Sequence, residues 1–223
     1  MALTLKQIRE EVRAGLGNRE DLEPRIDKAI NIAQNRIARS HKFDELYQTI
    51  DLTTTASQAT LALTSITNLD KIYSVVLVDS TSSRRLQSIP NRLWDKAIST
   101  LQSLTEARPQ YYSRWGNGSI EFLPTPDEVY TIRVKYSKWP ADLTDDNTTT
   151  ELLNQEDLII EYALHHLHKT LGNREDSEMY FRNYRNLLKE AIQDDETDFD
   201  TEYKPGFDSS ATDYWKDPFI KSL

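Results

Sequence analysis

The apolar residues of this chain change their spacing twice along its length, and this change limits the folds that it can adopt. Near the N-terminus, Leu5, Ile8 and Val12 recur at the three- to four-residue spacing of an amphipathic helix. Between residues 47 and 140 the spacing shortens towards two, which is typical of strands, and after a polar loop at 142–150 the helical spacing returns. The sequence therefore predicts an α+β fold in which a β-rich insertion separates two helical regions.

This pattern divides the chain into a helical domain, an insertion and an arm. Two helix pairs, at 1–46 and 151–193, are expected to form one helical bundle, with residues 47–150 as the β-rich insertion between them. From Asp194 onwards no apolar period remains, and acidic residues alternate with aromatic ones. A segment of this composition cannot bury enough apolar surface by itself, so we expect residues 194–223 to be an extended C-terminal arm.

Capping and turn signals support these elements. Thr4 and Asn18 are positioned to cap the first two helices, and Gly17 suits the left-handed residue that ends a helix. In the insertion, the Asn-Gly sequence within residues 115–118 predicts a tight hairpin, and Pro90 is suited to the first turn of one further helix.

One hexapeptide occurs twice. The sequence LGNRED stands at residues 16–21 and again at 171–176, each time between two helical stretches. It is either the same helix-ending turn used twice or the trace of a duplicated helical hairpin.

Composition narrows the possible functions. The longest strongly apolar run is Val75–Val78, far shorter than the ~20 residues of a membrane span. The first residues lack the apolar segment of a secretory signal, so we expect synthesis in the cytoplasm. Because the chain has no cysteine, it has no disulfide, thiolate metal site or thiol nucleophile.

The charge of the chain is concentrated near its C-terminus. The formal net charge is −9, and the segment 194–223 holds nine acidic residues and three lysines. This balance argues against a protein that grips nucleic acid, because such binding is driven by clustered lysine and arginine. It does not argue against a protein that lets DNA slide past.

The best enzymatic candidate is a helical cluster of histidines. Glu161 and His165 share one helix face and could hold a metal ion for a hydrolase or nuclease. His166 and His168 would point elsewhere around the helix, so the set cannot converge, and we favour a helix surface with exposed or partner-facing imidazoles. With only six glycines, the chain also lacks the P-loop and dinucleotide-binding patterns, so we expect no cofactor and no enzymatic activity.

Other candidates have ordinary structural explanations. The acid pairs Asp145–Asp146 and Glu156–Asp157 are interpreted as loop polarity and helix capping, and Arg84–Arg85 as a solvated turn that could touch phosphates. Four aromatic residues fit sheet packing but could also stack on sugars or bases in a tail accessory binding module: Tyr111, Tyr112, Trp115 and Trp139.

The arm combines acidic residues with large aromatic ones. It could be a solubilising spacer, but free tails rarely contain so many aromatic side chains, which are the anchors that a docking peptide needs. The candidate partner-binding residues are Tyr203, Phe207, Tyr214, Trp215 and Phe219.

The order of these parts resembles the head-to-tail adaptor (connector) proteins of tailed bacteriophages. The residues that carry the resemblance are Pro109-x-Tyr111, the run IEFLPTPDEVYTIRVKY at 120–136, Trp139-Pro140-x-x-Leu143 and the helix start DLIIEYAL at 157–164. The resemblance implies a structural protein of the virion neck, made in the cytoplasm of the host bacterium. Such adaptors form a ring, commonly of twelve copies, whose helical part builds the channel wall. The resemblance also implies that the C-terminal arm docks on the portal protein and that the ring offers a platform to tail or nozzle proteins. Genomic DNA would then pass through the lumen of the ring.

Overall fold

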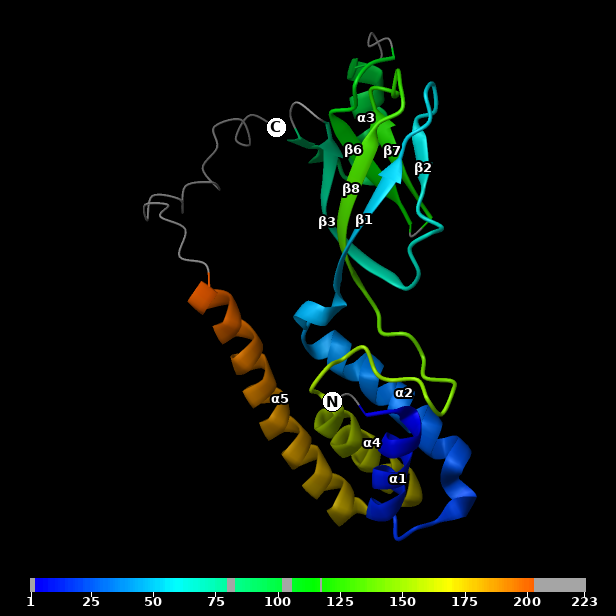
Figure 1. Cartoon of the computed structure of the whole chain (residues 1–223), viewed down its shortest axis with the longest axis vertical. Helices are drawn as coiled ribbons and strands as arrows, with labels where there is room; N and C mark the ends of the chain where they lie inside the picture. The colour runs from blue at the N-terminus through cyan, green and yellow to red at the C-terminus, as the bar shows by residue number, and fades with distance from the viewer. Residues whose placement is uncertain (1–2, 80–82, 102–105, 117, 203–223) are drawn as a thin grey trace.

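The computed structural model describes residues 3–79, 83–101, 106–116 and 118–202. Most of the helices gather at one end of an elongated molecule, and the strands lie at the other end together with helix α3 (Asn91–Leu101) (Figure 1). The predicted α+β fold is confirmed.

The helical part is built by segments from both ends of the chain. Its long helices are α1 (Leu5–Gly15), α2 (Glu23–Ser40), α4 (Glu156–Leu171) and α5 (Arg174–Glu202). Two short 3₁₀ helices, η1 (Glu20–Leu22) and η2 (Asp44–Leu46), precede and follow α2. Within the described residues, none of the helices combines the length and the apolar composition that a membrane crossing requires.

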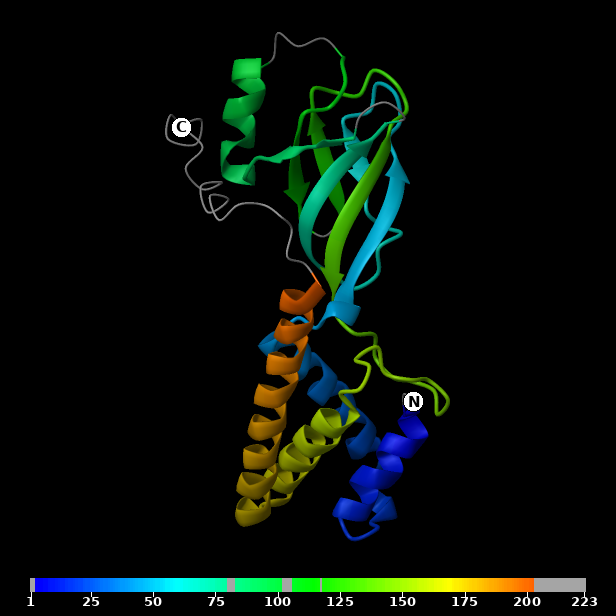
Figure 2. The same cartoon turned by 60° about the vertical axis from the view of Figure 1, so that its left-hand side comes forward.

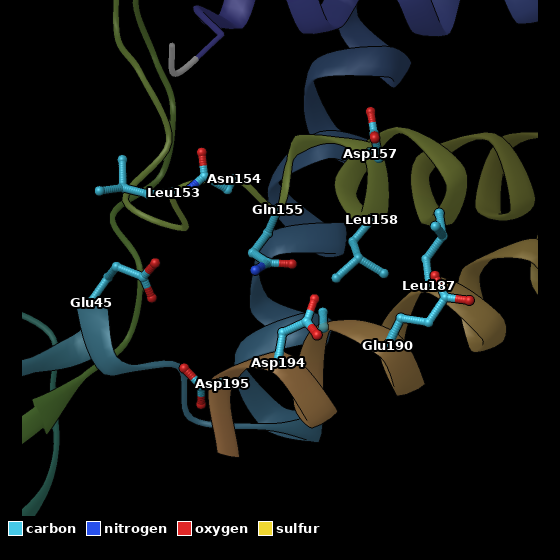
Figure 3. Close-up of a pocket in the computed structure, with 11 residues that line it drawn as sticks. Glu45, Leu153, Asn154, Gln155, Asp157, Leu158, Leu187, Glu190, Asp194 and Asp195 are labelled. Carbon is cyan, nitrogen blue, oxygen red and sulfur yellow. The ribbon is translucent and has the colours of Figure 1, made fainter. Parts of the chain in front are cut away.

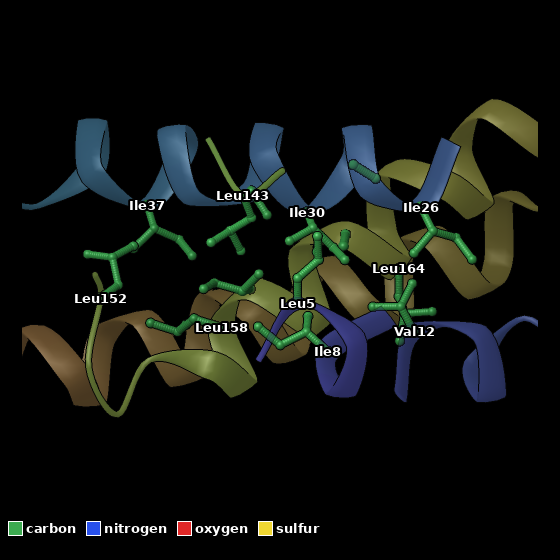
Figure 4. Packing of buried hydrophobic residues seen from close by; sticks show 14 of the residues in the cluster. Leu5, Ile8, Val12, Ile26, Ile30, Ile37, Leu143, Leu152, Leu158 and Leu164 are labelled. Atoms are coloured by element: carbon green, nitrogen blue, oxygen red, sulfur yellow. The ribbon is translucent and has the colours of Figure 1, made fainter. Parts of the chain in front are cut away.

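The apolar faces of α1, α2 and α4 meet in one core, which Figure 4 shows between the helices. Ile8, Ile30 and Ile159 are fully buried there, because each lies on the apolar stripe of its own helix. Leu143 and Leu152 close the core from the loop that leads into α4. The apolar residues that recur at helical spacing in the sequence therefore form the surfaces through which these helices pack.

The starts of the first two helices differ from each other. Thr4 caps α1 as predicted, since its Oγ1 accepts a hydrogen bond from the backbone N of Gln7 and the Gln7 side chain accepts one from the backbone N of Thr4. The prediction that Asn18 caps the second helix is wrong. Asn18 adopts a positive φ of 59° in the turn, η1 intervenes, and α2 begins only at Glu23 with Pro24 in its first turn.

The β part consists of two four-stranded sheets within the described residues. One has the strand order β1-β8-β3-β4, formed by β1 (Tyr47–Thr53), β8 (Thr131–Lys138), β3 (Leu69–Val78) and β4 (Arg84–Arg85). The other has the order β2-β7-β6-β5, formed by β2 (Thr60–Ala62), β7 (Ser119–Leu123), β6 (Tyr111–Trp115) and β5 (Gln87–Ser88). Helix α3 (Asn91–Leu101) is the helix expected after Pro90, and its Trp94 is buried.

The sheet register confirms the predicted hairpin and shows where the chain enters and leaves the β part. Trp115 faces Ser119 across the β6–β7 hairpin, as the Asn-Gly signal requires; Asn117 itself lies outside the described residues. Tyr47 faces Ser137 where β1 and β8 pair. The chain therefore enters and leaves the β part side by side.

Helix α5 is longer than the sequence indicates. Residues 194–202 were expected to begin the arm, yet they continue the helix to Glu202. Figures 1 and 2 both show its C-terminal end at the height where the strands begin.

Candidate interaction surfaces

A pocket with acidic walls lies where the C-terminal half of α5 faces the start of α4 (Figure 3). It encloses about 390 Å³, and no lysine or arginine is among the described residues that line it. We call it the acidic pocket after its five carboxylates: Glu45, Asp157, Glu190, Asp194 and Asp195.

Two of these carboxylates are in contrasting environments. Asp195 is paired with His41, whose Nε2 lies 2.5 Å from its Oδ2. The Oε2 atom of Glu45 is buried and has no hydrogen-bond partner within the described part of the chain. Burial raises the pKa of Glu45, and the charges of Asp195 and Asp44 raise it further. Among the described residues, Asp195 is therefore the one carboxylate of the pocket that has an ion-pair partner.

A second groove, of about 590 Å³, runs along α2. We call it the arginine groove; its lining residues are Ile32, Asn35, Arg36, Arg39, Trp139 and Tyr162. Arg36 and Arg39 are exposed, and in the described ranges no carboxylate pairs with either of them. The guanidinium carbon of Arg39 lies 5.8 Å from the ring centre of Trp139. Guanidinium groups beside aromatic rings suit a carboxylate or phosphate ligand.

The connection between the helical and β parts is held by charge. Lys42 follows α2, and its Nζ lies 3.0 Å from Oδ2 of Asp70 on β3 and 3.6 Å from the ring centre of Trp139. The side chains of Lys42 and Asp70 are 17% and 13% exposed, so this pair is shielded from solvent. The Ser137 hydroxyl donates a further hydrogen bond to Asp70. One cation therefore joins α2, β3 and the segment that leaves β8.

The histidines of α4 diverge, as the sequence predicts. His165 Nδ1 lies 2.9 Å from the backbone O of Ser177 at the start of α5, whereas burial lowers the pKa of His166 in a different environment. His168 stacks on Tyr180 with ring centres 5.2 Å apart. The expectation of exposed or partner-facing imidazoles is wrong for His168, which is only 6% exposed because α5 folds back over it.

Glu161 and His165, the candidate metal pair, are engaged in packing. Burial raises the pKa of Glu161, and Asn183 of α5 forms a hydrogen bond with it. His165 is directed to Ser177, as described above. Within the described residues no group of three or more histidine, cysteine or acidic side chains is arranged to hold a metal ion.

The acid pairs have separate roles. Asp146 forms an ion pair with Arg9 of α1 at 2.9 Å, and Glu156 accepts a hydrogen bond from the backbone N of Leu3. The first contact ties α1 to the loop before α4, and the second ties the residues before α1 to the first residue of α4. Asp157 instead lines the acidic pocket.

The remaining candidates of the β part are also dispersed. Arg85 is in a strand rather than a turn, and it donates a hydrogen bond to the backbone O of Tyr73. Tyr112 packs in the β core, Trp115 is exposed at the hairpin, and Trp139 lies under Lys42. The structure therefore does not gather these aromatic residues into one binding face.

The aromatic residues predicted to bind a partner lie outside the described residues. They are Tyr203, Phe207, Tyr214, Trp215 and Phe219. The sequence analysis did not single out Glu45, Arg36 or Arg39 as candidate site residues. The available signal was weak: both arginines lie beside the apolar stripe of α2 rather than on it.

The helical bundle thus carries one pocket lined by carboxylates and one groove lined by arginines. A family model of the SU10 adaptor protein matches residues 3–205. The match covers most of the chain, so this chain belongs to the SU10 adaptor protein family, and the resemblance to phage head-to-tail adaptors is confirmed. A search of curated proteins gives no match.

Family membership gives the chain a coarse role. It is a phage adaptor, a structural protein of the virion neck that contacts other capsid or tail components.

Proposed function

We propose that copies of this chain form a ring that binds the portal protein, joins it to the tail or nozzle proteins, and lets genomic DNA pass through its lumen. The observation that carries this proposal is the match to the adaptor family over residues 3–205. We expect twelve copies, as the family resemblance implies.

The helical part is suited to the ring. Closed rings are built from heterologous contacts, in which one surface of a subunit meets a different surface of the next. The helical part carries an acidic pocket and a separate arginine groove, which share no lining residue. A net charge of −9 also disfavours tight binding of DNA phosphates to the chain as a whole.

The arm is proposed to dock on the portal protein. It follows α5, whose end reaches the height of the connection between the helical and β parts (Figure 2). Its aromatic residues are Tyr203, Phe207, Tyr214, Trp215 and Phe219, and burying them in pockets of a neighbour would offset the cost of ordering the arm.

Electron microscopy tests this function. The purified chain is imaged alone and after mixing with rings of its cognate portal protein. We expect an added layer of density on one face of the portal, with the rotational symmetry of a ring. A chain that stays monomeric and leaves the portal bare would contradict the proposal.

A further inference from the structure

The helical part carries unneutralised charge of both signs on different surfaces. Arg36 and Arg39 are exposed in the arginine groove without a carboxylate partner among the described residues. In the C-terminal half of α5, residues 190–202 include seven acidic residues and no basic one. Acidic residues near a helix C-terminus oppose the helix dipole, and like charges at i, i+4 repel, as with Glu190 and Asp194. A charge of opposite sign from outside the subunit would therefore stabilise each of these two surfaces.

These two surfaces are not paired with each other within one subunit, as far as the structure describes the chain. Asp195 is held by His41, and Glu190 and Asp194 line the acidic pocket with Glu45. In Figure 3, α2 runs behind that pocket, and the arginine groove has none of the pocket's residues. Within the described residues, Glu190 and Asp194 therefore form no ion pair with the guanidinium groups of their own α2.

We propose that the arginine groove of one copy receives the acidic C-terminal half of α5 from the next copy. This contact rests on the ring of the proposed function and names its subunit interface. Glu190 and Asp194 supply carboxylates to Arg36 and Arg39, whose planar guanidinium groups bind carboxylates through paired hydrogen bonds. The apolar wall of the groove, formed by Ile32 and the two aromatic rings, excludes water around these ion pairs.

The charges fit a head-to-tail contact. A two-fold contact is self-complementary, so it would require the groove and the acidic half of α5 of one copy to meet their counterparts on the same partner. In a head-to-tail contact the groove meets one neighbour and the acidic half of α5 meets the other, so each interface needs only one such pairing. Repeating that contact generates a closed ring when the rotation closes, which is the assembly that an adaptor needs.

Charge reversal tests the contact in the full chain. One variant carries Arg36→Glu and Arg39→Glu, and the other carries Glu190→Lys and Asp194→Lys; Asp195 is left in place to keep its pair with His41. We expect each variant alone to self-associate at least about 10-fold more weakly than the wild type, and the two sets combined in one chain to recover to within about 3-fold. Sedimentation velocity measures association at about 0.05 M and about 0.5 M salt, and wild-type association should weaken at the higher salt.

A matched control changes the same charge elsewhere on α2. Arg25→Glu with Lys28→Glu reverses two exposed positions outside the groove and should leave association within about 3-fold of wild type. Circular dichroism of every variant should match that of the wild type, so that a weaker association reports the contact and not unfolding.

The outcomes separate this inference from the proposed function. If the wild type assembles on portal rings but reversal has no effect, or the combined variant fails to recover, the subunit contact is wrong and the adaptor role stands. The wild type and the variant with Arg36→Glu and Arg39→Glu are also tested for binding to a single-stranded oligonucleotide and to a peptide of residues 203–223. If the variant still forms rings but no longer binds the oligonucleotide, the groove binds phosphate and the proposed contact is wrong. If it still forms rings but no longer binds the peptide, the groove binds the arm and the contact is likewise wrong. A wild type that never multimerises overturns both proposals.

Discussion

Glu45 carries a charge that the folded chain accommodates poorly. Its Oε2 is buried without a hydrogen-bond partner in the described residues, and burial raises its pKa. The folded state therefore binds a proton at higher pH than the unfolded state, so this group contributes stability below its unfolded pKa and loses it as pH rises through the folded pKa. We expect Glu45→Gln to raise the melting temperature at neutral pH by about 2–4 °C, which corresponds to about 1 kcal/mol in a chain of this size.

The pH dependence makes this prediction specific. Melting followed by circular dichroism should show the gain at about pH 7.5 and its disappearance near pH 3, where the carboxyl group is protonated in both states. The control Glu10→Gln changes an exposed carboxylate of α1 and should stay within about 0.5 kcal/mol of the wild type. A lower melting temperature for Glu45→Gln at neutral pH would show that Glu45 has a stabilising partner.

The histidines of α4 show what residue spacing can and cannot predict. The rotation of about 100° per residue correctly excludes convergence of His165, His166 and His168 on one ion. This rotation does not predict where α5 lies, because the position of α5 depends on the left-handed turn at Gly172 and on which face of α5 packs against α4. Tyr180 therefore buries His168 against an expectation based on α4 alone.

Helices α1 and α4 approach closely at Gly15. A Cβ atom added there would lie 2.7 Å and 2.9 Å from the two Cδ atoms of Leu164, which is buried and cannot swing into solvent. Alanine favours a helix by roughly 1 kcal/mol over glycine, whereas overpacking a core costs about 1–3 kcal/mol. We expect Gly15→Ala to lower the free energy of unfolding by roughly 1 kcal/mol.

The same substitution in a chain that also carries Leu164→Ala tests why Gly15→Ala lowers the free energy of unfolding. When Leu164→Ala has removed the clashing atoms, Gly15→Ala should become neutral or stabilising, because the added methyl group then fills space. Urea unfolding of the four chains measures the sign change. The same loss in both backgrounds would place the cause in the backbone of α1 and not in the contact with Leu164.

The secondary structure was predictable wherever an apolar face is buried. The spacing of Leu158, Ile159 and Ala163 predicts α4, and those residues do lie in the core. The extension of α5 to Glu202 was not predictable, because residues 194–202 have no apolar stripe to reveal a helix. The pair of Asp195 with His41 joins residues 154 positions apart, a contact that local spacing does not encode.

Lys42 couples the helical and β parts. It forms an ion pair with Asp70 and covers the ring of Trp139, in a place where both charges are mostly shielded. Removing one partner of a shielded pair leaves the other charge without compensation. We expect Lys42→Met to destabilise the chain by about 1–3 kcal/mol and to increase protease cleavage in the loop 141–149.

A double-mutant cycle isolates this coupling. Lys42→Met with Asp70→Asn should be more stable than the sum of the single changes predicts, because the second change removes the uncompensated charge. Urea unfolding provides the four free energies. Additive losses would mean that Lys42 acts through packing on Trp139 and not through Asp70.

Two truncations distinguish the arm from the helix that carries it. A chain ending at Glu202 keeps the buried core and the Asp195–His41 pair, so its melting temperature and self-association should equal those of the full chain, while binding to portal rings falls at least about 10-fold. A chain ending at Ala191 also loses the acidic half of α5 and should fail to self-associate.

A variant of the full chain tests the aromatic residues of the arm. Changing Tyr214, Trp215 and Phe219 to serine keeps the charge of the arm but removes three of its proposed anchors, so portal binding measured by co-sedimentation should fall as in the chain ending at Glu202. If that variant binds the portal as the wild type does, Tyr214, Trp215 and Phe219 are not the anchors, and docking depends on Tyr203, Phe207 or the negative charge of the arm.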